Sequence, residues 1–329
     1  MAQPEWAVEV EHLVRRFGPV EAVADVSFQV RRGEIFGFLG PNGAGKSTTI
    51  KILATLLRAT SGRALLAGFD VATQPTQVRR SIGIVFQDHS LDDRLTAWEN
   101  LYFHALLYGV GRDEFTDRAQ ALLAMVDLLD RRDDVVRTFS GGMRRRLEIA
   151  RGLLHAPAVL FLDEPTVGLD PQTRSAIWQH VRRLRDERGV TVFMTTHYMD
   201  EADHCDRIAV IDHGRIVALG TPDELRRQVG SEAVLVGAPD AARLAAEVAE
   251  RYGVAARATG PGEARIEVAD AAAFLPRLAA DFAGRLESLR VHRPTLDDVF
   301  LHLTGREIRD EEASPLDAMR RRVMGRRRA

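Results

Sequence analysis

The sequence feature that most constrains the fold is a glycine-rich stretch at residues 40–47, GPNGAGKS. It fits the pattern G-x-x-x-x-G-K-[ST] and lies between an apolar run at residues 35–39 and a helical pattern that begins near Lys46. A strand, this loop and a helix, in that order, are the context in which the pattern binds phosphate. The glycines let successive backbone N–H groups point inward, and the helix N-terminus adds a positive dipole end. The stretch therefore predicts an α/β fold with a nucleotide-phosphate site.

Two side chains of this stretch predict how the phosphates are held. Lys46 is expected to reach the β- and γ-phosphates, and Ser47 to supply a hydroxyl to Mg²⁺. Lys46 and Lys51 are the only lysines of the sequence, and arginine fills the other cationic positions. A lysine kept at Lys46 thus suggests a need for a compact ammonium group. The alternative, an ordinary glycine-rich turn, is disfavoured by the strand and the helix on either side.

A second buried strand is predicted at residues 159–162, and two acids follow it directly, Asp163 and Glu164. The carboxyl ends of parallel strands form the edge of the sheet at which ligands bind. We expect Asp163 to hold Mg²⁺ and Glu164 to polarise the water that attacks the γ-phosphate. The alternative is a strand that simply ends in a polar turn. Neither lysine lies in the Asn-Lys-x-Asp motif that reads guanine, so ATP is favoured over GTP.

Length and composition describe a globular protein with more than one domain. The chain has 329 residues, 45% hydrophobic and 28% charged, which is about twice the usual domain length. Its 45 Lys and Arg against 47 Asp and Glu give a net charge of −2, so no global footprint for nucleic acid exists. The single cysteine, Cys205, excludes an internal disulfide. No apolar run approaches the roughly 18 residues that a membrane helix needs, and residues 1–6 lack the basic start of a secretory signal.

Hydrophobic patterns divide the chain into a nucleotide-binding domain at residues 6–230 and a smaller α+β domain at residues 231–305. The first domain combines an antiparallel flap, a mixed sheet with buried parallel strands, and a helical subdomain at residues 88–157. The arginine-rich residues 306–329 are expected to be disordered. The strands are expected at residues 7–14, 21–30, 35–39, 82–86, 159–162, 190–194, 207–219 as a hairpin, 233–236, 264–268 and 286–291.

A second glycine pair, Gly141 and Gly142, follows Ser140 at the start of a helical pattern. A serine cap and exposed N–H groups at a helix N-terminus form another anion-binding surface. The sequence here resembles the signature loop of the ATP-binding subunits of ABC transporters, with Phe139 and Met143 where Leu and Gln are usual. The resemblance implies a head-to-tail homodimer in which Ser140, Gly141 and Gly142 bind the γ-phosphate of ATP held by the opposite subunit. An ordinary capped helix is the alternative.

The other positions of this family are filled in order. Phe17 corresponds to the aromatic residue that stacks on adenine, Gln87 to the glutamine that touches Mg²⁺ and water, and His197 to the histidine that senses the γ-phosphate. Asp170 corresponds to the loop that contacts the second subunit. Taken alone, Phe17 would more often be a core residue, Gln87 would face solvent, and His197 would be structural. The implied catalytic residues are Glu164, His197, Lys46 and Gln87, the Mg²⁺ ligands are Ser47, Gln87 and Asp163, and the ATP-binding residues of the same subunit are Phe17, Gly40, Pro41, Asn42, Gly43, Ala44, Gly45, Lys46, Ser47 and Thr48.

Residues 294–305, PTLDDVFLHLTG, resemble the end of drug and antibiotic exporter ATPases of the daunorubicin-resistance type. Thr295 with Asp298 predicts a capping-box-like helix start, and an apolar face follows. The face consists of Leu296, Val299, Phe300 and Leu303. A docking helix is favoured over a drug contact, so this domain is expected to support dimerisation or regulation.

The resemblance implies a separate multi-span membrane permease, with this chain at the cytoplasmic face of the membrane. Residues 88–108, beside Gln87, are the expected docking surface. One helix face there is expected to carry Trp98, Leu101, Tyr102, Ala105 and Leu106. The alternative is an ABC ATPase that acts on ribosomes or nucleic acid. Only the arginine-rich tail supports this alternative. No specific nucleic-acid partner is expected.

Overall fold

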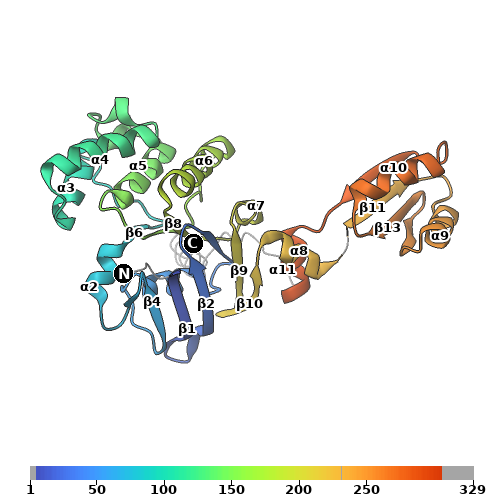
Figure 1. Ribbon diagram of the computed structural model, residues 1–329, viewed down its shortest axis with the longest axis horizontal. Helices are drawn as coiled ribbons and strands as arrows, with labels where there is room; N and C mark the ends of the chain where they lie inside the picture. The colour runs from blue at the N-terminus through green and yellow to red at the C-terminus, as the bar shows by residue number, and fades with distance from the viewer. Residues whose placement is uncertain (1–4, 231, 306–329) are drawn as a thin grey trace, which may run out of the picture. The chain divides into compact units, whose positions relative to one another are not determined.

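The computed structural model describes residues 5–230 and 232–305, which form two compact units divided between Pro222 and Asp223. Figure 1 shows their helices and strands. The expected tail at residues 306–329 lies outside the described residues. Among the described helices, none is long and apolar enough to cross a membrane.

The first unit is built on a six-stranded sheet with the order β10-β9-β3-β8-β7-β6. All neighbouring pairs are parallel except β9 and β10, which form the expected closing hairpin. Every residue of β3, β7 and β8 is buried, as their continuous apolar runs predict for strands covered on both faces. The strands are β3 (Ile35–Leu39), β6 (Ile82–Val85), β7 (Val159–Asp163), β8 (Thr191–Thr196), β9 (Arg207–Asp212) and β10 (Arg215–Gly220).

A four-stranded sheet, β2-β1-β4-β5, packs on this central sheet. Phe28 of β2 lies with its ring centroid 5.5 Å from Phe36 and 5.8 Å from Phe193 of the central sheet. The expected flap is confirmed, but it is larger than the alternating pattern at residues 7–30 predicted, because β4 and β5 join it from beyond the phosphate loop. The strands are β1 (Trp6–Phe17), β2 (Val20–Arg31), β4 (Ser61–Leu66) and β5 (Phe69–Asp70).

Helices α3, α4 and α5 form the expected helical subdomain and lie together in Figure 1. Thr96 and Glu99 form a complete capping box at the start of α3, which fixes where this helix begins. Only part of its predicted apolar face is buried: Leu101 and Ala105 are in the core, whereas Tyr102 and Leu106 are exposed. The helices of the unit are α1 (Lys46–Leu53), α2 (Pro75–Ser81), α3 (Ala97–Tyr108), α4 (Arg112–Met125), α5 (Gly141–Leu153), α6 (Pro171–Arg188) and α7 (Met199–Ala202), with short 3₁₀ turns at Leu129–Arg131 and Val136–Thr138.

The second unit contains an antiparallel sheet with the order β12-β13-β11-β14, and α9 and α10 supply buried side chains to its core. Strand β12 has mostly exposed residues and no apolar alternation, so the sequence pattern did not reveal it. The capping box of Thr295 and Asp298 is present at α11, as predicted. The elements are α8 (Pro222–Val229), β11 (Glu232–Gly237), α9 (Ala241–Tyr252), β12 (Ala256–Gly260), β13 (Glu263–Val268), α10 (Ala271–Asp281), β14 (Ser288–His292) and α11 (Leu296–Thr304).

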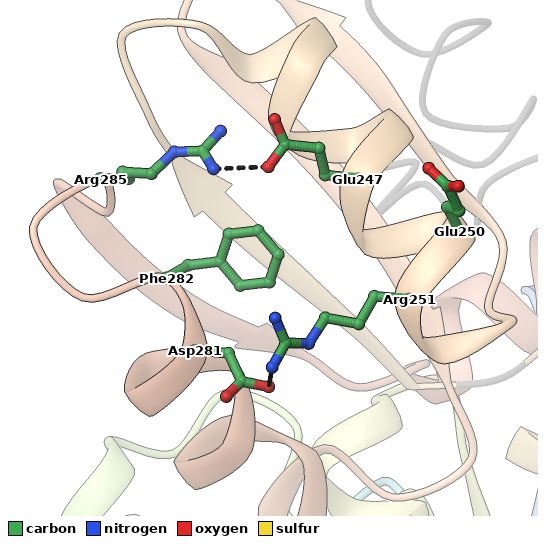
Figure 2. Close-up of a pocket in the computed structure, with 6 residues that line it drawn as sticks. All are labelled: Glu247, Glu250, Arg251, Asp281, Phe282 and Arg285. Carbon is green, nitrogen blue, oxygen red and sulfur yellow. Dashed lines mark hydrogen bonds and ion pairs between the residues drawn. The ribbon is translucent and has the colours of Figure 1, made fainter.

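A surface pocket of the second unit lies at the ends of α9 and α10 (Figure 2). The Arg285 guanidinium lies 2.5 Å from the Glu247 carboxylate, and Arg251 pairs with Asp281 at 2.8 Å. Both guanidinium groups also approach the ring of Phe282, at 5.4 Å for Arg285 and 6.0 Å for Arg251. The charges of the pocket therefore already compensate one another.

Candidate nucleotide-binding and hydrolysis site

The phosphate loop connects β3 to α1, and close backbone contacts require glycine at Gly40 and Gly45. Gly45 has φ +106°, and a Cβ there would lie 2.4 Å from the carbonyl oxygen of Ala22. At Gly40 a Cβ would lie 2.2 Å from the carbonyl oxygen of Ile211. Both distances are far below van der Waals contact, so any larger residue would displace the backbone. The N–H groups at the start of α1 thus form the phosphate-facing end of a tightly held turn.

Lys46, the first residue of α1, turns its ammonium group back over the loop. The Nζ atom donates to the carbonyl oxygens of Gly40 at 2.7 Å and Pro41 at 3.1 Å. It also lies 3.2 Å from Oε1 of Glu164, and the two side chains are only 4% and 9% exposed. Burial lowers the pKa of Lys46, against the attraction of Glu164 and Asp163. A buried ammonium group of this kind is stabilised by negatively charged partners. The negatively charged oxygens of a bound phosphate would be such partners.

Ser47 and Asp163 come together although they are far apart in sequence. The Ser47 hydroxyl donates to Oδ1 of Asp163 at 3.1 Å, and the Thr195 hydroxyl donates to the same atom at 2.5 Å. Thr195 thus fixes the carboxylate from the neighbouring strand β8. Hydroxyl and carboxylate oxygens at the mouth of a phosphate loop are the donor set that Mg²⁺ prefers, so these residues fit the ion.

Gln87 follows β6 and has an exposed side chain. Among the described contacts, none joins its side chain to Ser47 or Asp163 by a hydrogen bond. Its backbone is held instead, because the carbonyl oxygen accepts a hydrogen bond from Nη2 of Arg145 at 3.3 Å. The structure therefore fixes the position of the loop that carries Gln87 through its backbone.

Glu164 lies directly after β7 with φ +46°, a backbone conformation that residues other than glycine rarely adopt. Its N–H group is held by the hydroxyl of Thr195 at 3.1 Å, and Oε1 lies 3.3 Å from Nδ1 of His197. Burial would raise the pKa of Glu164, but the hydrogen bonds and charges of His197 and Lys46 outweigh burial and hold the pKa below its ordinary value. Glu164 is therefore ionised near neutral pH, between a cation and an imidazole.

Phe17 ends β1 and is 45% exposed, with the Arg15 guanidinium 4.4 Å from its ring centroid. An exposed aromatic ring of this kind suits base stacking, and the arginine lies over it as a second planar group. Among the described residues, the ring contact of Phe17 is with Arg15 and not with the phosphate loop.

The signature residues lie at the N-terminus of α5. The Ser140 hydroxyl accepts from the N–H of Met143 at 3.3 Å and caps the helix, as predicted. A Cβ at Gly142 would lie 2.3 Å from Cγ2 of Thr173 in α6, so only glycine fits there. Gly141, by contrast, is exposed beside it. The capped helix end thus presents N–H groups at the surface rather than to the phosphate loop of the same chain.

Asp170 caps α6 in this structure. Its carboxylate accepts from the N–H of Thr173 at 2.9 Å and from the Thr173 hydroxyl at 2.6 Å. Those hydrogen bonds lower the pKa of Asp170 below its ordinary value. The residue expected at a subunit contact therefore also starts a helix, a local role that the sequence pattern Asp-Pro at residues 170–171 could have revealed.

A buried ion pair that sequence reasoning missed connects α5 to the Gln87 loop. Arg145 donates to the carbonyl oxygen of Phe86 at 2.5 Å and lies 3.3 Å from Oε2 of Glu148. Glu148 in turn accepts from the N–H of Ser90 at 2.7 Å. The signal was present as two opposite charges three residues apart on the otherwise buried face of a helix. Their contacts join the signature helix to both ends of the segment after β6.

The fold and the site define a P-loop ATPase cassette. A family model described as "ABC transporter" matches residues 23–167, and one described as "ATP-binding protein DrrA1-3-like, C-terminal domain" matches residues 220–304. The solved structure of an ATP-binding subunit of an ABC transporter aligns with a TM-score of 0.61 and 32% identity, over 68% of this chain and 92% of that one. The dimeric structure of the cassette MJ0796 aligns with a TM-score of 0.59 and 28% identity, over 65% and 98%.

Curated relatives match along nearly the whole length of the chain. The daunorubicin/doxorubicin resistance ATP-binding protein DrrA of Streptomyces peucetius is 43% identical over 322 residues, 95% of this chain and 97% of that protein. The linearmycin resistance ATP-binding protein LnrL of Bacillus subtilis is 37% identical over 311 residues, 92% and 100%. The chain belongs to the ABC transporter family as an ATP-binding subunit of the drug-resistance type, and it binds and hydrolyses ATP.

Proposed function

We propose that this chain hydrolyses ATP to power the export of a drug, antibiotic or other hydrophobic compound through a separate membrane permease. The main support for ATP hydrolysis is the buried cluster of Lys46, Glu164 and His197. This cluster lies beside the Ser47–Asp163 pair. Export is supported by the relatives, whose names describe resistance to daunorubicin, doxorubicin and linearmycin.

In the proposed reaction, the phosphate loop and Lys46 bind the β- and γ-phosphates of ATP. Ser47, Asp163 and Gln87 would hold Mg²⁺, which when bound neutralises charge on the phosphate oxygens. The ionised Glu164 accepts a hydrogen bond from the attacking water and orients it. His197 holds the Glu164 carboxylate on one side and binds the γ-phosphate on the other.

The signature residues complete a second copy's site. Ser140, Gly141 and Gly142 present a capped helix end at the surface, and this geometry suits a phosphate that arrives from outside the chain. We infer a head-to-tail homodimer with two shared ATP sites, in which the Asp170 segment contacts the partner copy. The dimeric structure of a related cassette supports this arrangement.

The permease is proposed to dock on α3. Exposed large apolar side chains gather on this helix, where Leu107 is 68% exposed and Phe103 58%. Such side chains are expected at a surface that another protein covers. The Arg145 and Glu148 contacts connect the adjoining Gln87 loop to α5, so docking can affect the signature helix. The chain would then sit at the cytoplasmic face of the membrane.

The test is co-purification of the tagged chain from gently solubilised native membranes in the presence of ATP. We expect one multi-span membrane protein in equal amounts, lost with Leu107→Asp and retained with Val217→Asp, which changes an exposed apolar residue of β10 instead. Recovery of ribosomes or nucleic acid without a membrane protein would contradict the transport function and favour the alternative ABC ATPase.

A further inference from the structure

Glu201 is a buried carboxylate beside the hydrolysis site that the proposed reaction does not use. It lies on the short helix α7, and the residue is 1% exposed. Its oxygens accept from two threonines of different segments: Oε2 from the Thr196 hydroxyl at 2.6 Å, and Oε1 from the Thr166 hydroxyl. A buried carboxylate costs free energy unless such hydrogen bonds compensate it, so its contacts specify the local structure.

The two threonines belong to the segments that carry the hydrolysis residues. Thr196 is the last residue of β8 and directly precedes His197, whereas Thr166 follows Glu164 by two residues in the turn toward α6. The N–H of Tyr198 donates to the Thr196 hydroxyl at 2.9 Å. Because that oxygen already accepts one hydrogen bond, its own proton is directed to Glu201. The carboxylate therefore joins the backbone of two segments whose side chains meet at 3.3 Å between His197 and Glu164.

Glu201 also lines a cavity of about 270 Å³ between α6 and α7. Arg174 of α6, at 3.8 Å, Asp200 of the same helix and His197 act on the charge of Glu201. His204 is a further titratable group that lines the cavity. Burial raises the pKa of Glu201 to about 7, against the hydrogen bond of Thr196 and the charge of Arg174.

We propose that Glu201 is a positioning residue of the ATPase reaction, whose carboxylate holds the Thr166 turn and the Thr196 strand end together and thereby keeps Glu164 and His197 in mutual contact. This inference rests on the proposed roles of Glu164 and His197. The ionised carboxylate accepts both threonine hydroxyls. Protonation converts one oxygen into a donor, and one threonine contact is then lost or reversed. Hydrolysis is therefore faster with Glu201 ionised, and kcat rises as pH increases through about 7.

The decisive variant is Glu201→Gln, which preserves volume but replaces one acceptor with an amide donor. We expect kcat for ATP to fall about tenfold, because small misplacement of reacting groups is costly, while KM changes less than about twofold. The rise of kcat near pH 7 is expected to disappear. The control is Asp200→Asn, which removes the neighbouring exposed charge on the same helix. It should preserve kcat at high pH, and because the Asp200 charge raises the pKa of Glu201, it should shift the rise of kcat to lower pH without abolishing it.

Thr166→Val provides a second, independent variant that leaves Glu201 in place. It should lower kcat in the same way, Thr166→Ser should restore it, and the loss should not add to that of Glu201→Gln. A wild-type kcat in Glu201→Gln would overturn the proposal. So would a lowered kcat that retains the wild-type pH profile and accompanies a lower thermal midpoint, since that pattern describes a structural role. If Glu164→Gln, measured in parallel, hydrolysed ATP at the wild-type rate, the proposed site itself would fail instead.

Discussion

Two ion pairs, one in each unit of the chain, differ in their exposure to solvent. In the first unit, Lys46 and Glu164 form an ion pair whose side chains are 4% and 9% exposed, and in the second, Arg285 and Glu247 form one whose side chains are 42% and 35% exposed. Figure 2 shows the second pair at the rim of its pocket. Burial makes the first pair costly to break but poor as a source of net stability, whereas solvent screens the second. The buried pair belongs to the candidate hydrolysis site, whereas the exposed pair lies on the surface of the second unit.

The comparison also separates two kinds of hydrogen-bond partner. Asp163 and Glu164 are held by residues of a neighbouring strand and of the phosphate loop, so their geometry depends on the whole central sheet. The acids of the Figure 2 pocket contact arginines on the same or an adjacent helical segment. Substitutions at the phosphate site should therefore change ATP binding and turnover, whereas substitutions in the Figure 2 pocket should change only stability. The effects at the phosphate site should also be larger.

The largest effect is expected for Glu164→Gln. Loss of the carboxylate removes the group that orients the attacking water, and turnover should fall by roughly a hundredfold or more. ATP binding should persist, because the phosphate loop is unchanged, and binding and hydrolysis can be measured separately by titration calorimetry and phosphate release. Glu247→Gln makes the same chemical change in the second unit and should leave turnover unchanged. Near-normal turnover of Glu164→Gln would remove the residue from this role.

The next effect is expected for Lys46→Ala, which removes the cation that faces the phosphates. ATP affinity should fall by about tenfold or more, since hydrogen bonds to charged groups contribute about 1.5–3 kcal/mol. Lys51→Ala is a matched control, because Lys51 is the other lysine of α1 and is exposed in its last turn. Equal ATP affinity in the two variants, measured by calorimetry, would contradict the assignment of the phosphate loop.

A smaller effect, confined to stability, is expected for Thr295→Ala. The change removes the capping box of α11 and should lower the free energy of unfolding of the second unit by about 1 kcal/mol. The free energy of unfolding can be measured by chemical denaturation. ATP turnover per folded molecule should not change. Thr259→Ala in the exposed strand β12 is the comparison variant, expected near zero. A lower turnover with Thr295→Ala would show that the second unit takes part in hydrolysis.

The smallest effect at neutral pH is expected for Glu247→Gln. The hydrogen bonds of Arg285 and Arg243 lower the pKa of Glu247 to about 2 from the ordinary 4.5. Because the folded-state pKa is depressed, its stabilisation is present above about pH 4.5 and is lost as pH falls toward 2. At neutral pH the wild-type protein should therefore have a slightly higher thermal midpoint than the variant. This difference should disappear only as the pH falls from about 4.5 toward 2. A difference that instead grew as pH fell would contradict this sign.

The sequence predicted the phosphate loop, the strand ending in Asp163 and the Ser140 cap because each depends on residues close together in the chain. The parallel strands were equally recoverable, since burial on both faces gives a continuous apolar run such as residues 159–162. Strand β12 was missed because its exposed face has no alternation to detect. The apolar face predicted for α3 contains both buried Leu101 and exposed Tyr102 and Leu106, because helical periodicity does not distinguish a core from an exposed apolar surface.

The remaining omissions concern contacts between distant segments. Arg145 reaches the carbonyl oxygen of Phe86, and Glu201 reaches Thr166, across sequence separations of 59 and 35 residues. No local pattern encodes such a pair, because its partners are fixed by how β6, β7 and β8 align in the sheet. The candidate reacting groups could thus be proposed from sequence, whereas the residues that hold them in place required the fold.

The left-handed backbone at Glu164 has a consequence for engineering this chain. His213, at φ +46°, shares this uncommon conformation, and glycine could relieve it there without removing a reacting group. The same exchange at Glu164 would relieve the same strain and delete the carboxylate that is proposed to orient the attacking water. It would also leave the buried ammonium group of Lys46 without its carboxylate partner, and that cost outweighs the relief of strain. A selection for heat resistance alone would therefore accept glycine at His213 and reject it at Glu164. Of the two positions, glycine is therefore a stabilising replacement only at His213.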